Sequence, residues 1–365
     1  MSWDAIIRPD LAGLEPYRPG LRASEVRERT GRERVIKLSS NESPYGPFPS
    51  AVAAIASIAP RLNRYPDGSS RALRRKLASG LGISAEEVVV GAGSNELLRL
   101  IAQAVLTPGD EVVYAWPSFV VYPMVCGTFG VTAVPVPLKD GVHDVDAMLA
   151  AVGKRTKLMF LCNPNNPTGT IYGREAFAKV LAGVPEHVLV VVDEAYFEFV
   201  TSAEYPNGME AFDGERPLVV ARTFSKIYGL AGARVGYAAV PKPLAAAVDA
   251  IREPFNVSSL AQAAAHYSID DEAEVRRRRA SNQEQKAYLY SSFDRLGIRY
   301  LPSEANFVWV VTERPVEAFE ALLAEGVIVR GFGAADALRV TVPSAEDAPA
   351  VAAAFEAVVG RLGSL

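Results

Sequence analysis

The sequence has few of the residues that bind metals or form disulfides. Its 365 residues include two cysteines, Cys126 and Cys162, and three histidines that stand singly. Two cysteines cannot form a disulfide framework, and neither belongs to a Cys-x-x-Cys motif or to a Cys/His cluster of the zinc-binding type. Scattered histidines also disfavour a Ser-His-Asp triad. The composition therefore predicts no metal site, and reduced thiols are typical of the cytoplasm.

Long hydrophobic runs and an excess of one charge are also absent. No uncharged run approaches the roughly 20 residues that span a bilayer, and the first 20 residues lack the apolar stretch of a signal peptide. The net charge of −4 gives no electrostatic reason to expect nucleic acid as a partner. We expect a soluble cytoplasmic protein that binds neither membranes nor nucleic acid.

The length of the chain and its changes of pattern predict two domains. Residues 1–30 begin with a proline-rich stretch, which predicts an extended arm that belongs to the smaller domain. Over residues 31–253, short apolar runs alternate with helical patterns, as in a parallel sheet with helices on both faces. Residues 254–365 have a different pattern, with a long helix followed by strands and two further helices. We therefore expect an α/β fold with a large domain and a smaller α+β domain.

The apolar runs and helical periods predict the individual elements. In the large domain, strands are expected at 87–90, 111–114, 157–162, 188–192, 218–221 and 235–239, and helices at 71–81, 96–106, 119–126 and 174–181. In the smaller domain, helices are expected at 272–296, 316–325 and 348–362, and strands at 307–311, 327–329 and 338–342, the last two forming a pair.

A lysine stands just beyond one of the apolar strands. Lys226 follows hydroxyl side chains and precedes a glycine-rich stretch. A lysine at a strand end in a partly dry site has a lowered pKa and can attack an aldehyde. Ser225 and Arg234 could hold a phosphate, because a hydroxyl and a guanidinium fork match its oxygens. Taken alone, these residues also fit a solvated surface loop.

Two other loops follow buried strands. Asp193 ends a very apolar strand, at the edge of the sheet where ligands bind in open α/β folds. A buried carboxylate there needs a cationic partner, and a protonated pyridine nitrogen is one. The segment from Asn163 to Gly169 predicts a rigid loop that could present an amide to a ring oxygen. Alone, Asp193 also fits a helix N-cap, and the asparagine segment an ordinary turn.

The segment Gly91-Ala92-Gly93-Ser94-Asn95-Glu96 predicts a turn from a strand into a helix. Its backbone N–H groups could bind a phosphate at the helix N-terminus. The pattern is similar to that of dinucleotide-binding folds, but Glu96 occupies the third glycine position of G-x-G-x-x-G, and no Lys-Ser/Thr pair follows as in a P-loop. A nucleotide-binding oxidoreductase is therefore disfavoured.

These four signals occur in order along the chain, each at the carboxyl end of a strand. With them, the chain resembles the fold-type I pyridoxal phosphate (PLP) aminotransferases of the histidinol-phosphate/aromatic group. Further matching motifs are Arg8-Pro9, Tyr17-Arg18-Pro19-Gly20, Leu38-Ser39-Ser40-Asn41-Glu42, Tyr65-Pro66-Asp67 and Leu338-Arg339-Val340-Thr341. The resemblance implies a mostly parallel seven-stranded sheet in the large domain, and a homodimer.

The resemblance also implies roles for the matching positions towards the cofactor. Lys226 would carry pyridoxal 5'-phosphate as a Schiff base and move the substrate proton, and Asp193 would pair with the pyridine nitrogen. Asn166 and Tyr196 would hydrogen-bond the phenolic oxygen. The phosphate would be held by Gly93, Ser94, Asn95, Ser225 and Arg234.

Other matching positions would stack on the cofactor or bind the substrate. Phe119 falls where the family stacks an aromatic ring on the cofactor, usually a tyrosine. Tyr65 would reach the phosphate in the partner subunit. The substrate would be contacted by Tyr17, Asn41, Arg330 and Arg339, the last of which would clamp the α-carboxylate.

Two branches of the group differ in substrate. Arg330 does not separate them, because both branches keep it. The segments 223–232, 255–265 and 302–309 resemble those of actinobacterial phenylalanine/aromatic aminotransferases. We therefore expect the amino group of an aromatic amino acid to pass to 2-oxoglutarate by a ping-pong mechanism. Histidinol-phosphate aminotransferase is the alternative, followed by relatives such as threonine-phosphate decarboxylases.

Overall fold

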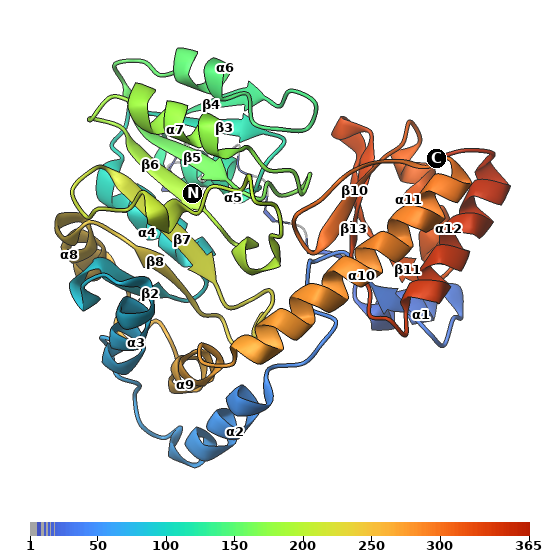
Figure 1. The fold of residues 1–365 in the computed structure, drawn as a ribbon, viewed down its shortest axis with the longest axis horizontal. Coiled ribbons are helices and arrows are strands. Elements are labelled where there is room, and N and C mark those ends of the chain that lie inside the picture. Colours follow the sequence, from blue (N-terminus) through green and yellow to red (C-terminus); the bar gives the residue numbers. More distant parts are fainter. Residues whose placement is uncertain (1–5, 9–10, 12–13, 15, 18) are drawn as a thin grey trace.

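The structure is a computed structural model that describes residues 6–8, 11, 14, 16–17 and 19–365. Much of the predicted N-terminal arm, including Pro9 and Arg18 of the quoted motifs, lies outside the described residues. The described chain forms a larger and a smaller region, and the long helix α10 (Glu272–Leu296) runs from one to the other (Figure 1). None of the described helices is long and apolar enough to cross a membrane.

A seven-stranded sheet forms the centre of the larger region. Its strand order is β2-β8-β7-β6-β5-β3-β4, and only β8 runs antiparallel to its neighbours. The strands are β2 (Val88–Gly91), β3 (Glu111–Trp116), β4 (Thr132–Pro137), β5 (Thr156–Cys162), β6 (Leu189–Asp193), β7 (Leu218–Thr223) and β8 (Gly236–Ala239). The predicted α/β fold with a mostly parallel seven-stranded sheet is confirmed.

Strand β4 is the one strand of this sheet that the apolar pattern does not predict. It lies at the edge of the sheet, is mostly exposed and contains Pro135 and Pro137. Proline cannot donate a ladder hydrogen bond and is tolerated mainly at sheet edges. An exposed edge strand therefore lacks the apolar run by which the central strands are recognised.

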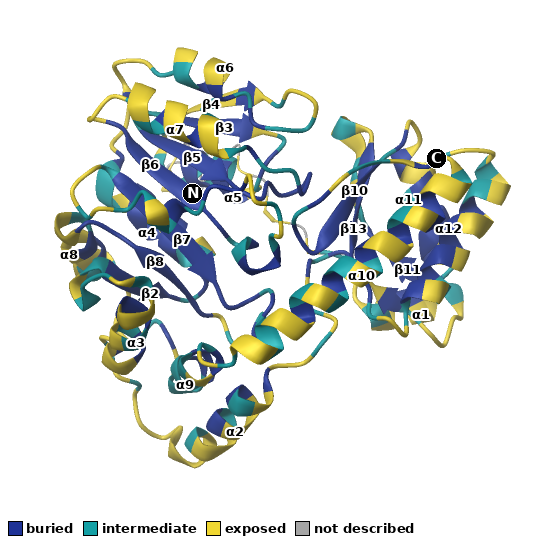
Figure 2. Cartoon of the chain, viewed as in Figure 1, coloured by how far each residue is buried: buried dark blue, intermediate teal, exposed yellow. Residues whose placement is uncertain are grey.

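Helices cover both faces of the central strands. Successive strand residues point to opposite faces, so Val191 packs in the cluster with α4 (Ser94–Val105), α5 (Val121–Phe129) and α8 (Lys242–Ile251). Val190 and Val192 pack in the cluster on the other face, with α6 (Val145–Ala150) and α7 (Arg174–Gly183). Burial on both faces explains the apolar runs within β5, β6 and β7, and these strands are mainly dark blue in Figure 2.

The smaller region contains two sheets. A four-stranded antiparallel sheet has the order β12-β13-β10-β9, and a two-stranded parallel sheet joins β1 to β11. The strands are β1 (Ile36–Lys37), β9 (Arg299–Leu301), β10 (Phe307–Val311), β11 (Val327–Ile328), β12 (Arg330–Phe332) and β13 (Ala337–Thr341). Apolar side chains of α10, α11 (Pro315–Ala324) and α12 (Ala348–Leu362) form one core with these strands.

The predicted strand pair of residues 327–329 and 338–342 is wrong. Strand β13 pairs with β10 and β12, whereas β11 pairs with β1 near the other end of the chain. A short apolar run indicates burial but does not specify a partner, because pairing depends on the fold around it. Helices α10 and α12, by contrast, have the predicted bounds.

Core packing bears on the domain limits expected at residues 31 and 254. Ile36 and Leu38 lie in the core of the smaller region. In the larger region, α9 (Ser259–Ser268) packs with α2 (Pro49–Ile58) and α3 (Arg71–Leu81). The division into 1–30, 31–253 and 254–365 stays a proposal, and these contacts favour shifting both limits a little further along the chain.

Candidate active site

The predicted site residues gather at the carboxyl ends of the central strands. Asn166 follows β5, Asp193 ends β6 and Lys226 follows β7. These three strands are adjacent and parallel, so their carboxyl ends meet at one edge of the sheet, where open α/β folds bind ligands. The sheet topology therefore brings together side chains that are far apart in sequence.

Asp193 presents one unpaired carboxylate oxygen. Its side chain is 1% exposed, its Oδ2 accepts a hydrogen bond from the Tyr122 hydroxyl at 3.0 Å, and its Oδ1 has no hydrogen-bond partner among the residues that the structure describes. Burial raises the pKa of Asp193 to about 6, against the lowering effects of the Tyr122 hydroxyl, the backbone N–H of Ala195 and the Lys226 cation. Because an unsatisfied buried acceptor is costly, Oδ1 indicates a ligand that donates a proton or a hydrogen bond.

Lys226 lies half-buried just beyond β7. Burial, followed by the nearby Arg339 cation, lowers the pKa of Lys226 to about 8. Its Nζ lies 5.5 Å from the ring centre of Tyr196. Near neutral pH, a larger share of this amine is uncharged than for an exposed lysine, and only the uncharged amine can attack an aldehyde.

A turn and an arginine form a cradle for an anion. Gly93 precedes α4, which begins with Ser94 and Asn95, and Gly93 has a φ of 87°. The positive φ favours glycine at this position, and a Cβ there would lie 2.6 Å from Nη2 of Arg234, so the guanidinium would have to move. Nη1 of Arg234 lies 3.5 Å from Oγ of Ser225. Backbone amides at a helix N-terminus, a hydroxyl and a guanidinium together fit a phosphate.

Hydrogen bonds join the two regions at the site. Asn41 donates from Nδ2 to the hydroxyl of Tyr196 at 2.9 Å. Arg339 donates from Nη1 to Oδ1 of Asn166 at 2.5 Å and from Nη2 to the carbonyl of Ser39 at 2.8 Å. Burial lowers the pKa of Arg339 to about 10. Tyr196 and Asn166 of the larger region thus meet Asn41 and Arg339, which pack with the smaller one.

Four further predicted residues, Phe119, Tyr65, Arg330 and Tyr17, make contacts through aromatic rings. Phe119 packs edge-on against Tyr122, with ring centres 5.9 Å apart. Tyr65 is 82% exposed and stacks on Phe255 at 4.6 Å. The Arg330 guanidinium lies 5.7 Å from the ring centre of Tyr17, which is itself 53% exposed.

Tyr122 and the ion pair of Arg222 with Glu194 are not among the sequence-predicted site residues. Tyr122 lies within the helix predicted at 119–126, but its spacing gives no sign that its hydroxyl reaches Asp193. Arg222 and Glu194 are both buried and lie 2.7 Å apart, next to the strand ends that carry the site. A charged residue inside the apolar β7 run is a sequence signal for such a buried pair.

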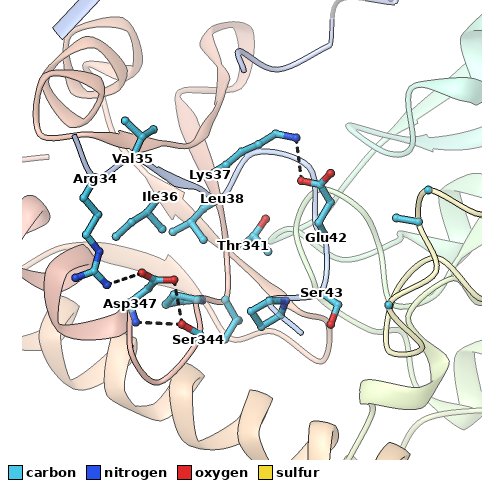
Figure 3. Close-up of a pocket in the computed structure, with 16 residues that line it drawn as sticks. Arg34, Val35, Ile36, Lys37, Leu38, Glu42, Ser43, Thr341, Ser344 and Asp347 are labelled. Carbon is cyan, nitrogen blue, oxygen red and sulfur yellow. Dashed lines mark hydrogen bonds and ion pairs between the residues drawn. The ribbon is translucent and has the colours of Figure 1, made fainter. Parts of the chain in front are cut away.

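A cavity of about 430 Å³ opens between residues 34–38, 42–44, 229, 231–232, 341–344 and 347 (Figure 3). Its cations are paired, Arg34 with Asp347 at 2.7 Å and Lys37 with Glu42 at 2.9 Å. The cavity shares a wall with the site through Thr341, whose hydroxyl accepts a hydrogen bond from the backbone N–H of Asn41. None of the predicted site residues lines the cavity.

Solved structures with the same architecture define the class of fold. The crystal structure of histidinol-phosphate aminotransferase from Sinorhizobium meliloti, in complex with pyridoxal-5'-phosphate, is 29% identical to this chain with a TM-score of 0.89. The match covers 98% of each chain. The protein therefore has the fold of the fold-type I aminotransferases.

Sequence comparison then defines the family. The family of class I and II aminotransferases matches residues 33–357, and the chain belongs to this family. Histidinol-phosphate aminotransferase from Moorella thermoacetica is 45% identical over 340 residues, which cover 92% of this chain and 88% of that protein. Aromatic amino acid aminotransferase from Corynebacterium jeikeium is 44% identical over 365 residues, 98% of this chain and 95% of that protein. The predicted resemblance is confirmed, and the protein is a PLP-dependent aminotransferase.

The geometry of the site fits this cofactor. The unpaired Oδ1 of Asp193 matches a protonated ring nitrogen, and the Lys226 amine matches the cofactor aldehyde. The cradle of Gly93 and Arg234 matches the phosphate. Among the residues that the structure describes, no three His, Cys, Asp or Glu side chains are grouped in a way that could hold a metal ion.

Proposed function

We propose that the enzyme transfers the amino group of an aromatic amino acid to 2-oxoglutarate, in the two half-reactions of a ping-pong mechanism. The surroundings of Arg330 carry this proposal. A hollow of about 320 Å³ beside Arg330 has ten described lining residues, and Arg330 is the one charged residue among them. One guanidinium among apolar side chains suits an aromatic ring better than a phosphate, whose charge approaches −2 and favours several cationic donors.

Aromatic side chains around the two arginines support the same substrate class. Trp309 and Phe332 have ring centres 5.0 Å apart, and the Arg339 guanidinium lies 5.8 Å from the Phe332 ring. Arg330 and Arg339 are directly opposite on β12 and β13, so their side chains share one face of the sheet. We assign the α-carboxylate of the substrate to Arg339, and the side-chain end of the substrate to the surroundings of Arg330 and Tyr17.

The proposal also assigns roles to the residues around the cofactor. When bound, PLP supplies an aldehyde that condenses with amines and a ring that accepts the electron pair released at the substrate Cα. Lys226 would hold the cofactor, and its uncharged amine would then take the proton from the substrate Cα and deliver it to the carbon of the cofactor aldehyde. Asp193 stabilises the positive charge on the ring nitrogen, and Phe119 stacks on the ring.

The phenolic oxygen of the cofactor is assigned to Tyr196 and Asn166. Oδ1 of Asn166 already accepts a hydrogen bond from Arg339, so its amide NH2 remains to donate. The phosphate is assigned to Gly93, Ser94, Asn95, Ser225 and Arg234. Asn41, which donates to the Tyr196 hydroxyl, would lie between the cofactor and the substrate.

We also propose a homodimer in which Tyr65 of each chain reaches the phosphate site of the other chain. The stacked pair of Tyr65 and Phe255 leaves both rings substantially exposed, which favours burial against a second subunit. A cytoplasmic location is part of the proposal, and the two free, buried cysteines are compatible with it.

Histidinol phosphate is the second candidate for the amino donor. Arg330 is a cation that could pair with its phosphate, and the relatives from M. thermoacetica and S. meliloti carry that activity in their names. The imidazole of histidinol phosphate is itself an aromatic ring, so the same hollow could hold it. The two candidate amino donors therefore differ in whether the substrate carries a phosphate group.

A paired assay tests the substrate. With 2-oxoglutarate as acceptor, kcat/KM is measured for phenylalanine and for histidinol phosphate under the same conditions. We expect phenylalanine to be preferred by at least about tenfold, which corresponds to about 1.4 kcal/mol of differential transition-state binding. A preference of this size for histidinol phosphate would overturn the aromatic assignment but leave the aminotransferase class intact.

A further inference from the structure

A buried tyrosine contacts the carboxylate assigned to the cofactor ring. The side chain of Tyr122, on α5, is fully buried, and its hydroxyl donates to Oδ2 of Asp193 at 3.0 Å. Its ring stacks on Phe160 of β5, with ring centres 4.4 Å apart and planes 10° apart. Close stacking fixes the ring, and therefore the position of the hydroxyl.

Tyr122 can only act as a donor in this contact. Burial and the neighbouring Asp193 charge raise the pKa of Tyr122 well above its usual value, so the phenol keeps its proton. A carboxylate accepts but does not donate. The contact therefore occupies Oδ2 and leaves Oδ1, which has no hydrogen-bond partner in the described part of the chain, as the acceptor for the ring.

We propose that Tyr122 is a positioning residue for the cofactor, which it orients by holding Oδ2 of Asp193 so that Oδ1 faces the pyridine nitrogen. The inference rests on the proposed role of Asp193. Without the hydroxyl, the carboxylate can rotate and its charge loses one of its few stabilising donors. The ring N–H then meets a less ordered and weaker acceptor, and the ring becomes a poorer electron sink.

The test is Tyr122→Phe, which keeps the ring and removes only the hydroxyl. Tyr114→Phe is the matched control, because Tyr114 is buried in the same aromatic cluster, 6.0 Å from Tyr122. We expect Tyr122→Phe to weaken PLP binding, measured by titrating the apoenzyme, by about tenfold to a hundredfold, as for the loss of a hydrogen bond to a charged group. It should also lower kcat, with little change in KM for the amino donor.

A double-mutant cycle separates positioning from packing. If Tyr122 acts through Asp193, Tyr122→Phe should have almost no further effect on PLP affinity or on the cofactor absorbance spectrum in an Asp193→Asn background. The same loss in both backgrounds, or equal losses in Tyr122→Phe and Tyr114→Phe, would overturn the inference. If Asp193→Asn alone left PLP affinity and spectrum unchanged, the assignment of Asp193 would fail instead.

Discussion

The cofactor half of the site and its substrate half are built by different kinds of contact. Asp193 ends β6, and Lys226 follows the adjacent strand β7 of the same sheet. The backbone hydrogen bonds between these strands set the spacing of the two residues. Asn41 and Arg339 reach the site from segments packed with the smaller region, and their hydrogen bonds to Tyr196 and Asn166 cross the boundary. With the roles proposed above, the chemistry would depend on the carboxyl ends of a rigid sheet, and substrate binding on how the two regions meet.

The largest effect is expected at the carboxyl ends of the central strands. Lys226→Ala should lower turnover by at least about a thousandfold, because it removes the covalent anchor and the proton-transfer group together. The absorbance band of protein-attached PLP should also disappear. A variant that kept both turnover and this band would contradict the assignment.

Lys286 supplies the matched control for that variant. Lys286 is a second lysine whose pKa burial lowers to about 8, and on α10 it donates to the carbonyl of Ser303. Lys286→Ala should lower the melting temperature, because it leaves a buried acceptor unpaired, but should keep the cofactor absorbance band. Loss of the band in both variants would mean that lysine burial alone, rather than position at the sheet edge, accounts for it.

A smaller effect is expected where the two regions meet. Arg339→Lys keeps the charge but loses the planar fork that binds a carboxylate through two hydrogen bonds. We expect kcat/KM for the amino acid to fall by about tenfold to a hundredfold, mainly through a higher KM. PLP affinity should change little, and a fall in kcat alone would show that Arg339 acts in the chemical step.

The same arginine links the two halves electrostatically. The Arg339 cation helps to lower the pKa of Lys226 to about 8, so Arg339→Gln should raise that pKa. The uncharged fraction of Lys226 at neutral pH then falls, and the rate at which the apoenzyme captures PLP should rise with pH only at higher pH than in the wild type. Arg339→Lys, which keeps a cation, is the control. An unchanged pH profile in Arg339→Gln would show that Arg339 does not influence the pKa of Lys226.

The smallest effect is expected at the stacking ring. Phe119→Tyr adds a hydroxyl to the ring that is proposed to stack on the cofactor and keeps the aromatic face. A new neutral hydrogen bond is worth about 0.5–1.5 kcal/mol, so PLP affinity, measured by titration of the apoenzyme, should change by no more than about tenfold. A larger gain would mean that the missing hydroxyl limits cofactor binding.

The part of the site at the carboxyl ends of the central strands could be predicted well, because the sequence signals for it are local. Continuous apolar runs predict strands buried on both faces, and a change to polar or glycine residues marks where each strand ends. Asp193 and Lys226 stand directly at such changes. Helix α10 could be predicted to its ends for the same reason, since Asp271 caps its first turn and Gly297 ends it in the left-handed conformation.

The junction of the two regions could not be predicted in the same way. The partner of β11 is β1 at the other end of the chain, and no local pattern specifies that pairing. The contact of Asn41 with Tyr196 likewise depends on how the segment after β1 crosses to the larger region. Tyr122 has the burial expected of a helix residue, and only its position above β5 and β6 makes it a donor to Asp193.

The sequence by itself determined the central strands β5, β6 and β7, the helices α10 and α12, the loops at the strand ends and the side chains those loops carry. These features follow from periodicity, turn residues and caps, which act over a few neighbouring positions. Only the tertiary structure decided which carboxylate oxygen of Asp193 accepts a hydrogen bond from Tyr122 and which atom of the Asn166 side-chain amide is left to bind a ligand. It also decided that Arg339 lies near enough to lower the pKa of Lys226. Those properties depend on distances of a few ångströms between segments far apart in the chain, and packing alone sets such distances.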